Sequence, residues 1–320
     1  MDCGRTLSCW ERSSVSVSIS RREKPVLRTR LLEATPIAVV APSLAASFVY
    51  VFLFVGWTFY ISLSDSTLLP SLGFVGIKNY LTLWTNRTWT VAYTNLLFFS
   101  VFSVLGTMAL GLLLAILIDQ KVRLEAFWRT IFLYPMAVSF IVTGTVWSWL
   151  YNPQTGVQHL LRAMGLSNVV FALTTDRNTA IWAIIITGIW GGAGFAMALF
   201  LAGLRSVDQD IVKAAQIDGA SWFRIYARVI LPSIRPIFLA VTVVLLQSAI
   251  KTFELAVALT NSGPGTATTF PAAYVYNLLF TRGKIGEGAA AAVMIVAALA
   301  IVLVPYSLYL GWRKRQASST

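Results

Sequence analysis

Residues Asn95 to Ile118 read NLLFFSVFSVLGTMALGLLLAILI and contain no charged side chain. A helix of about 20 apolar residues is long enough to cross the roughly 30 Å hydrocarbon core of a bilayer. Lipid offers no hydrogen-bond partners to the backbone, so a spanning segment must be a helix or part of a closed barrel. The stretch lacks the alternation of polar and apolar residues found in barrel strands. It therefore predicts a transmembrane helix.

Five other stretches are similarly long and apolar. They are Thr35 to Leu63, Thr130 to Leu150, Thr179 to Leu204, Ile237 to Leu259 and Ala289 to Trp312. Hydrophobic residues make up 57% of the sequence and charged residues 12%, proportions that lie outside the usage of soluble domains. We therefore expect an all-α, polytopic membrane protein with six transmembrane helices.

The distribution of Lys and Arg predicts the orientation of these helices, because basic residues accumulate in short cytoplasmic segments. With the N-terminus inside, most basic residues fall before Thr35, in loops 119–129 and 205–235, and after Trp312. Both termini are therefore expected in the cytoplasm. The predicted division is a disordered tail (1–34), a first span (35–63), a periplasmic segment (64–94), a transmembrane domain (95–312) with its cytoplasmic loop (205–235), and a second tail (313–320).

The N-terminal residues and the net charge do not indicate another class of protein. Residues 1–30 lack the apolar core of a signal peptide, so they are read as a disordered tail or as the product of an upstream start codon. The net charge is +12, but the basic residues follow the topology and not one face with interleaved aromatic residues, so no nucleic-acid partner is expected. Cys3 and Cys9 have no metal-binding or redox spacing, so no metal site is expected.

Loop 205–235 is longer and more polar than a simple connection between two spans requires. Its first half has Ile211, Ala214, Ala215 and Asp218 at helical spacing, followed by Gly219, which can adopt a positive φ at a helix end. Its second half repeats apolar residues at intervals of three and four, namely Trp222, Phe223, Tyr226, Val229 and Ile230. The loop therefore predicts two short amphipathic helices joined by a glycine.

The stretch Lys213-Ala-Ala-Gln-Ile-Asp-Gly-Ala220, followed by Phe223 and Ile230-Leu231-Pro232, resembles the EAA loop of binding-protein-dependent ABC importer permeases. The family pattern is E-A-A, three residues, G, and an apolar stretch that closes on L-P. Lys213 stands where this pattern has Glu. In the family this loop docks into a cleft on the ATPase subunit. The resemblance therefore implies ATPase-coupling roles for Lys213, Ala214, Ala215, Asp218, Gly219, Ala220, Phe223 and Pro232.

Two further stretches resemble the carbohydrate branch of the same family. Lys251 to Pro264 resembles the end of the fifth span and the T-x-G-G-P turn, with Ser262 in place of the first Gly. Trp190 to Leu204 also resembles this branch. The resemblance implies a type I ABC importer permease fold in a bacterial inner membrane, with a sugar as the cargo, and within the branch it points to glucose and mannose permeases.

The resemblance also implies a set of partners. These are a periplasmic solute-binding protein, a second permease subunit in a heterodimer, and two ATPase subunits that hold ATP and Mg. The sequence contains no G-x-x-x-x-G-K-[ST] phosphate-binding loop. We therefore expect the chain to be a transport subunit that binds no cofactor and performs no enzymatic reaction itself.

The candidates for the solute pathway are Trp190, Lys251 and Glu254, inside the predicted spans, and Asn261, just after the fifth. Lys251 and Glu254 are three residues apart, so on one helix they would share a face and neutralise one another. Charge within a span marks by default a pathway or a partner contact, and the alternative is an ion pair that fixes helix packing. Trp190 either stacks on a sugar or contacts lipid and other helices.

The fourth span contains several glycines, which small-residue packing between transmembrane helices explains better than a phosphate-binding loop does. They are Gly188, Gly191, Gly192 and Gly194. Two other functions were weighed. An ion-driven secondary transporter would need inverted repeats and intramembrane carboxylates, of which only Glu254 qualifies. A membrane enzyme would need a cluster of His, Asp or Glu, whereas the sequence has one His. The long amphipathic loop favours the importer.

Overall fold

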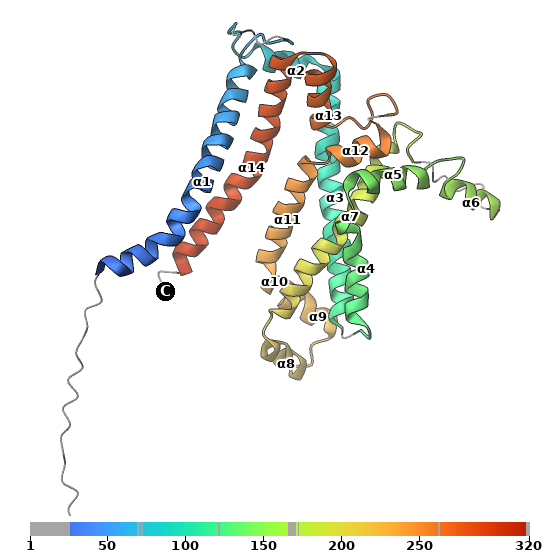
Figure 1. Cartoon of the computed structure of the whole chain (residues 1–320). Coiled ribbons are helices and arrows are strands. Elements are labelled where there is room, and N and C mark those ends of the chain that lie inside the picture. Colours follow the sequence, from blue (N-terminus) through green and yellow to red (C-terminus); the bar gives the residue numbers. More distant parts are fainter. Residues whose placement is uncertain are drawn as a thin grey trace, which may run out of the picture. The chain divides into compact units, whose positions relative to one another are not determined.

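The computed structural model shows an all-helical chain (Figure 1). It describes residues 26–317 apart from 69, 70, 72, 121, 166–170, 172 and 262. The chain divides into two units, Met1–Val55 and Gly56–Thr320. In the first unit, helix α1 (Val26–Ser62) starts before the expected position Thr35 and continues into the second unit. Residues 1–25 of the predicted tail lie outside the described residues.

Four of the described helices are individually long and apolar enough to cross a membrane. They are Val40–Ser62 within α1, α3 (Arg87–Asp119), α7 (Ala180–Arg205), and Ile285–Tyr309 within α14 (Ile285–Ala317). These helices contain the first, second, fourth and sixth predicted spans or most of their length. The prediction of an all-α polytopic membrane protein is confirmed.

The third and fifth predicted spans are broken. Helices α4 (Glu125–Ala137) and α5 (Phe140–Leu150) meet at 98°, next to Pro135, whose ring and missing N–H disrupt helical hydrogen bonding. Segment Trp222–Ser233 meets α11 (Arg235–Ile250) at 67°, just before the fifth predicted span begins at Ile237. The count of six spans therefore holds only when each bent pair is one span. Helix α11 also ends before the expected Leu259, because a turn separates it from α12 (Phe253–Thr260).

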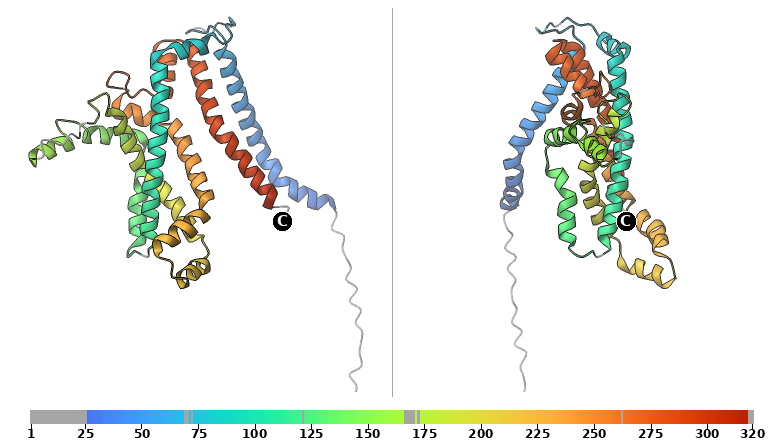
Figure 2. Two further views of the ribbon diagram at one scale, coloured as in Figure 1. Left: turned by 180° about the vertical axis from the view of Figure 1, so that it is seen from behind. Right: turned by 90° about the vertical axis from the view of Figure 1, so that its right-hand side faces the viewer.

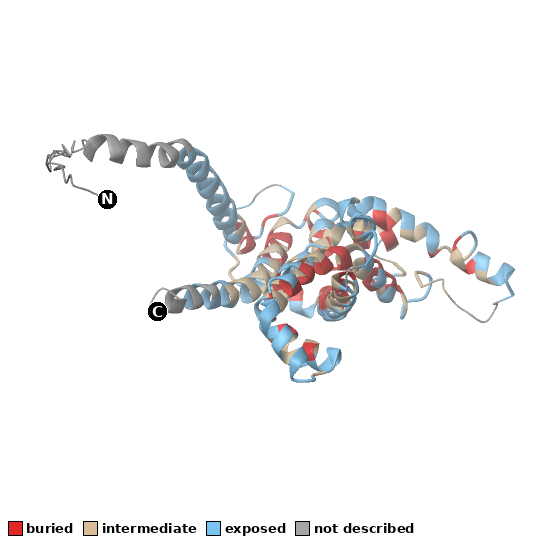
Figure 3. Ribbon diagram, turned by 90° about the horizontal axis from the view of Figure 1, so that it is seen from below, coloured by how far each residue is buried: buried red, intermediate tan, exposed pale blue. Residues whose placement is uncertain are grey.

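Helix α7 organises the interior of the second unit. It packs against α3, α4 and α11, and the views in Figure 2 show α3, α4 and α7 running side by side. Met197 and Phe200 of α7 are fully buried with Ala115 of α3. In Figure 3 the buried residues gather among these helices, whereas the outward faces are exposed. Exposed apolar faces are expected of helices whose solvent is lipid.

The glycines of α7 explain how closely its neighbours approach. A Cβ on Gly194 would overlap the carbonyl oxygen of Phe132 in α4, and it would lie 2.8 Å from the Phe132 carbonyl carbon. Gly188 and Gly192 are in tight contact with α3 side chains, at 3.2 Å from Phe99 and 3.1 Å from Thr107. The packing prediction is confirmed for these three. It is wrong for Gly191, because a Cβ there would meet nothing within 4 Å.

Shorter helices cover the two ends of the bundle. At one end, α2, α13 and η2 pack on α14 and on the start of α3 around the buried Trp89 and Tyr274. Their bounds are Lys78–Thr85, Pro271–Tyr276 and Asn277–Thr281, and α6 spans Val157–Ala163. The opposite end of α7 carries α8 (Gln209–Ile217), α9 (Trp222–Ile225), η1 (Tyr226–Ile230) and α10 (Leu231–Ser233), as Figure 1 shows. The loop singled out in the sequence therefore projects from one end of the bundle.

Candidate coupling site and solute pathway

Helix α8 begins almost directly after α7 and is capped at both ends. Asp208 is its N-cap, and the Asp208 carboxylate accepts a hydrogen bond of 2.9 Å from the Asp210 backbone N–H. Such a cap satisfies one of the free N–H groups of the first turn. Asp210 places a further negative charge there, which the helix dipole favours, and its carboxylate pairs with Lys213 Nζ at 3.0 Å.

The end of α8 is a Schellman motif. The Ala220 N–H donates to the Ala215 carbonyl at 3.1 Å, and the Gly219 N–H donates to the Gln216 carbonyl at 3.0 Å. Gly219 has a φ of +74°, a conformation that favours glycine. A Cβ there would meet nothing within 4 Å, so the backbone conformation and not steric crowding requires glycine. The prediction of two short helices joined by Gly219 is confirmed.

The loop has one buried face and one exposed face. Val212, Ile225 and Ile230 are buried against apolar residues of α3 and α7. On the other face, 87% of Ile217 and 85% of Phe223 are exposed. Among the residues expected to couple to the ATPase, Lys213, Ala214, Asp218 and Gly219 are also exposed, and Ala215, Ala220 and Pro232 are partly buried.

The second loop helix differs from its prediction. The sequence pattern predicts Trp222 and Phe223 on the apolar face with Tyr226, but both are exposed, and the buried position is Ile225. From Tyr226 the helix widens into the π-helix η1, which changes the spacing on which the predicted face was based. Pro232 does not end the helix, because it lies within α10 and the chain bends only at Ile234.

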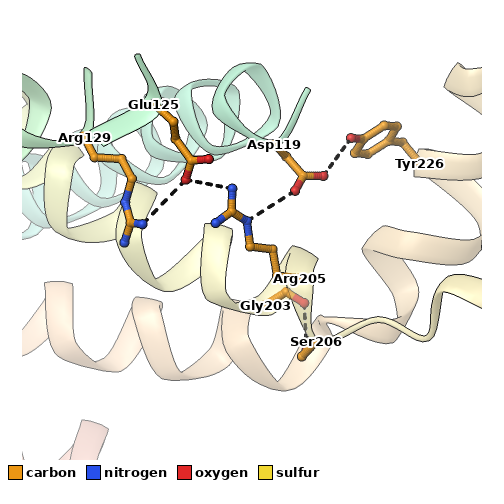
Figure 4. A network of polar contacts seen from close by, with 7 residues as sticks. All are labelled: Asp119, Glu125, Arg129, Gly203, Arg205, Ser206 and Tyr226. Atoms are coloured by element: carbon orange, nitrogen blue, oxygen red, sulfur yellow. Dashed lines mark hydrogen bonds and ion pairs between the residues drawn. The ribbon is translucent and has the colours of Figure 1, made fainter. Parts of the chain in front are cut away.

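A network of charged side chains joins this loop to three span ends (Figure 4). Arg205, the last residue of α7, lies with Nε 3.7 Å from Asp119 Oδ1 and donates from Nη2 to Glu125 Oε1 at 2.8 Å. Arg129 lies 3.5 Å from the same Glu125 oxygen. The Tyr226 hydroxyl donates to Asp119 Oδ2 at 3.4 Å. Burial raises the pKa of Tyr226, and the nearby Asp119 carboxylate raises it further, so the phenol remains a donor at neutral pH.

Sequence reasoning did not predict this network. Arg129 and Arg205 were used only as markers of the cytoplasmic side. The signal in the sequence was weak but present, because Asp119 and Glu125 bracket the short loop after the second span and Arg205 ends the fourth span on the same predicted side.

A cavity of about 440 Å³ lies between α3, α7, the bent pair α4 and α5, and the neighbouring helices α11 and α12. Most of its lining is apolar, and several of the lining residues carry a hydroxyl group. They are Ser103, Thr107, Ser139, Thr143, Thr187, Ser248 and Thr252. The break between α4 and α5 contributes Val138 and Ser139, and the break between α11 and α12 contributes Thr252. Non-helical backbone at membrane depth is tolerated where it lines such a cavity.

Of the predicted pathway residues, Glu254 lines this cavity, and Trp190, Lys251 and Asn261 do not. The expectation that Lys251 and Glu254 share a helix face is wrong. Helix α11 ends at Ile250 and α12 begins at Phe253, so the two residues belong to different helices. Both are exposed, and they form no ion pair with each other in the described structure.

The other two pathway candidates, Trp190 and Asn261, are exposed. Trp190 packs edge-on against Trp147 with ring centroids 5.7 Å apart, and 39% of it is exposed. Asn261 caps the C-terminus of α12 with a φ of +49°. Ser262, the departure from the T-x-G-G-P turn, lies outside the described residues.

Residues 86–315, which include the projecting loop and the cavity helices, match the protein family described as the binding-protein-dependent transport system inner membrane component. The chain belongs to this family of permeases. It is 38% identical over 268 residues to a probable ABC transporter permease of Pyrococcus horikoshii, a match that covers 83% of this chain and 91% of the relative. It is 32% identical to the trehalose/maltose transport system permease protein MalF of Thermococcus litoralis, over 80% of this chain and 86% of MalF.

Solved structures agree on the fold of this permease. The crystal structure of a bacterial ABC transporter involved in the import of the acidic polysaccharide alginate contains a chain that matches with a TM-score of 0.72 and 25% identity. The match covers 88% of this permease and 97% of that chain. The predicted type I importer permease fold is therefore confirmed.

Proposed function

We propose that this permease is the membrane subunit of an ATP-driven importer that carries a sugar by alternating access. The observation that supports it most strongly is the capped helix α8, which projects from one end of the bundle with Ile217 and Phe223 exposed. Exposed apolar side chains on a rigid turn are suited to bind in an apolar cleft of a protein partner. Sugar transport is supported by the names of relatives, which include a trehalose/maltose permease and a xylose/arabinose import permease of Haloferax volcanii.

The partners follow from this function. Two ATPase subunits hold ATP and Mg and receive the α8–α9 projection, and a second, distinct permease completes the transmembrane pathway. A soluble binding protein delivers the sugar on the opposite side. Both termini and loop 205–235 lie in the cytoplasm. Lys213 is exposed on α8 and pairs with Asp210, so the ATPase surface opposite it meets an ion pair where the family pattern has a Glu.

The cavity provides the solute pathway on this side of the permease pair. Its volume of about 440 Å³ falls in the range typical of small-molecule sites, which combine apolar walls with a few placed polar groups. Ser103, Thr107, Ser248 and Glu254 are among the residues that line this cavity, and their side chains end in hydroxyl or carboxylate groups. These groups can accept hydrogen bonds from sugar hydroxyls, and the apolar lining suits the C–H faces of a sugar ring.

The docking face can be tested with Ile217→Asp, compared with Leu160→Asp on α6. Both leucine-sized side chains are exposed on short helices, by 87% and 61%, and only Ile217 lies on the proposed face. A buried carboxylate without a partner is costly, so Ile217→Asp should abolish co-purification of the ATPase subunits and Leu160→Asp should preserve it. ATPase binding retained by Ile217→Asp, or sugar uptake that needs an ion gradient and no ATPase, would overturn the proposal.

A further inference from the structure

Arg205 forms two ion pairs that differ from the other ion pairs in the described part of the chain. Lys213–Asp210, Lys284–Glu287 and Arg129–Glu125 each join residues three or four positions apart, within one helix or at its first turn. The two pairs of Arg205 instead join α7 to the end of α3 and the start of α4. Its guanidinium uses different nitrogens for the two carboxylates, which fixes the relative direction of the three helix ends.

The network is not what holds the fold together. The side chains of Arg205, Asp119 and Glu125 are 44%, 26% and 30% exposed, and ion pairs near solvent contribute about 0–1 kcal/mol. The loop is already attached to the bundle by a buried apolar cluster that includes Val212, Ile225 and Leu204. Apolar burial is non-directional, however, and it allows packed surfaces to slide. The network therefore fixes the orientation of the loop relative to the helix ends, in a contact that apolar packing already stabilises.

The connectivity of the chain shows which helices depend on the network for their orientation relative to the loop. The α8–α9 projection is covalently continuous with α7 before it and with α11 after it. Helices α3 and α4 also form cavity walls, through Ser103, Thr107, Pro135 and Met136, yet neither is covalently continuous with the projection. The polar route from the projection to α3 is Tyr226 to Asp119, and the route continues through Arg205 to Glu125 at the start of α4.

We propose that Asp119, Arg205 and Tyr226 are positioning residues that pass movement of the α8–α9 projection to helices α3 and α4 at the wall of the cavity. This inference rests on the proposed function, since it assigns a route by which ATPase movement reaches the solute site. The π-helix η1 starts at Tyr226, and π-turns within helices occur frequently at functional sites.

The experiment uses the complete reconstituted transporter and measures the sugar molecules transported per ATP hydrolysed. Arg205→Gln removes both inter-helix ion pairs and keeps a polar, though shorter, side chain. Tyr226→Phe removes only the bond to Asp119 and keeps the ring. Arg205→Lys keeps the charge but lacks the planar fork needed to reach both carboxylates. The control is Glu287→Gln, which breaks a local ion pair of 2.7 Å.

Coupling between distant sites typically changes binding affinity by fivefold or more. We expect Arg205→Gln to lower the transport-to-ATP ratio by at least about fivefold while ATPase subunits still co-purify. Tyr226→Phe should lower it less, Arg205→Lys should restore part of it, and Glu287→Gln should leave it unchanged. Combining Arg205→Gln with Asp119→Asn should add little, because both changes interrupt one network.

Different outcomes would refute the proposed function and the positioning role. A wild-type complex without ATP-driven uptake would refute the proposed function. A coupled wild type in which Arg205→Gln and Tyr226→Phe keep the same ratio as Glu287→Gln would refute the positioning role alone. If Arg205→Gln fails to assemble, the ratio measured for Tyr226→Phe decides, because this variant keeps both ion pairs of Arg205.

Discussion

Replacing Gly194 by alanine should force α4 away from α7. The added Cβ would overlap the Phe132 carbonyl oxygen, and it would lie 2.8 Å from the Phe132 carbonyl carbon and 3.1 Å from Leu133 Cα. These are backbone atoms, so no side-chain rotation can relieve the contact. Overpacking costs about 1–3 kcal/mol. Because the obstacle here is backbone, we expect a cost of about 3 kcal/mol. The helix propensity of alanine over glycine offsets about 1 kcal/mol, which leaves a net loss of about 2 kcal/mol.

Gly191→Ala is the matched control, because it makes the same change on the same helix where nothing lies within 4 Å. It keeps the propensity gain and meets no obstacle. The assay is thermal unfolding of the purified permease in detergent. At about 2–4 °C per kcal/mol, Gly194→Ala should lower the midpoint by roughly 4–8 °C, and Gly191→Ala should not lower it. Equal shifts in the two variants would refute the packing argument.

Three further predictions concern the loop and the cavity. Asp208→Ala should weaken the start of α8 by about 1 kcal/mol, seen as faster amide exchange in α8, and unchanged exchange would contradict the cap. Glu254→Gln should lower sugar uptake because Glu254 lines the cavity, whereas Lys251→Ala should not; the reverse order would exclude this cavity as the pathway. Phe223→Ala should reduce ATPase affinity without lowering the unfolding midpoint, because Phe223 is 85% exposed; a lowered midpoint would contradict its placement.

The sequence predicts the long apolar helices well, since length and hydropathy alone indicate a span. The helix end at Gly219 was equally predictable, because a glycine that follows a helical repeat is a local signal. The breaks inside the third and fifth predicted spans were missed because an apolar stretch reads the same whether its helix is straight or bent. Pro135 was a usable signal for the first break. The turn at Lys251 has no comparable marker, so the shared face expected for Lys251 and Glu254 failed with it.

Contacts between segments distant in sequence could not be predicted at all. Gly191 and Gly194 are alike in sequence terms, and they differ only because the backbone of α4 lies against one of them. The bonds of Arg205 depend in the same way on α3 and α4 ending beside α7. These features follow from how the helices pack, which hydropathy and periodicity along one helix do not report.

ATP-driven sugar uptake by the complete transporter, compared between Gly219→Pro and Gly165→Pro, tests the coupling role of the projecting loop most directly. Both glycines follow short helices, have φ values of +74° and +83°, and donate a backbone hydrogen bond of 3.0 Å that proline cannot make. We predict that Gly219→Pro abolishes uptake while the permease still reaches the membrane, and that Gly165→Pro retains it. Uptake at the wild-type rate in Gly219→Pro would contradict the account.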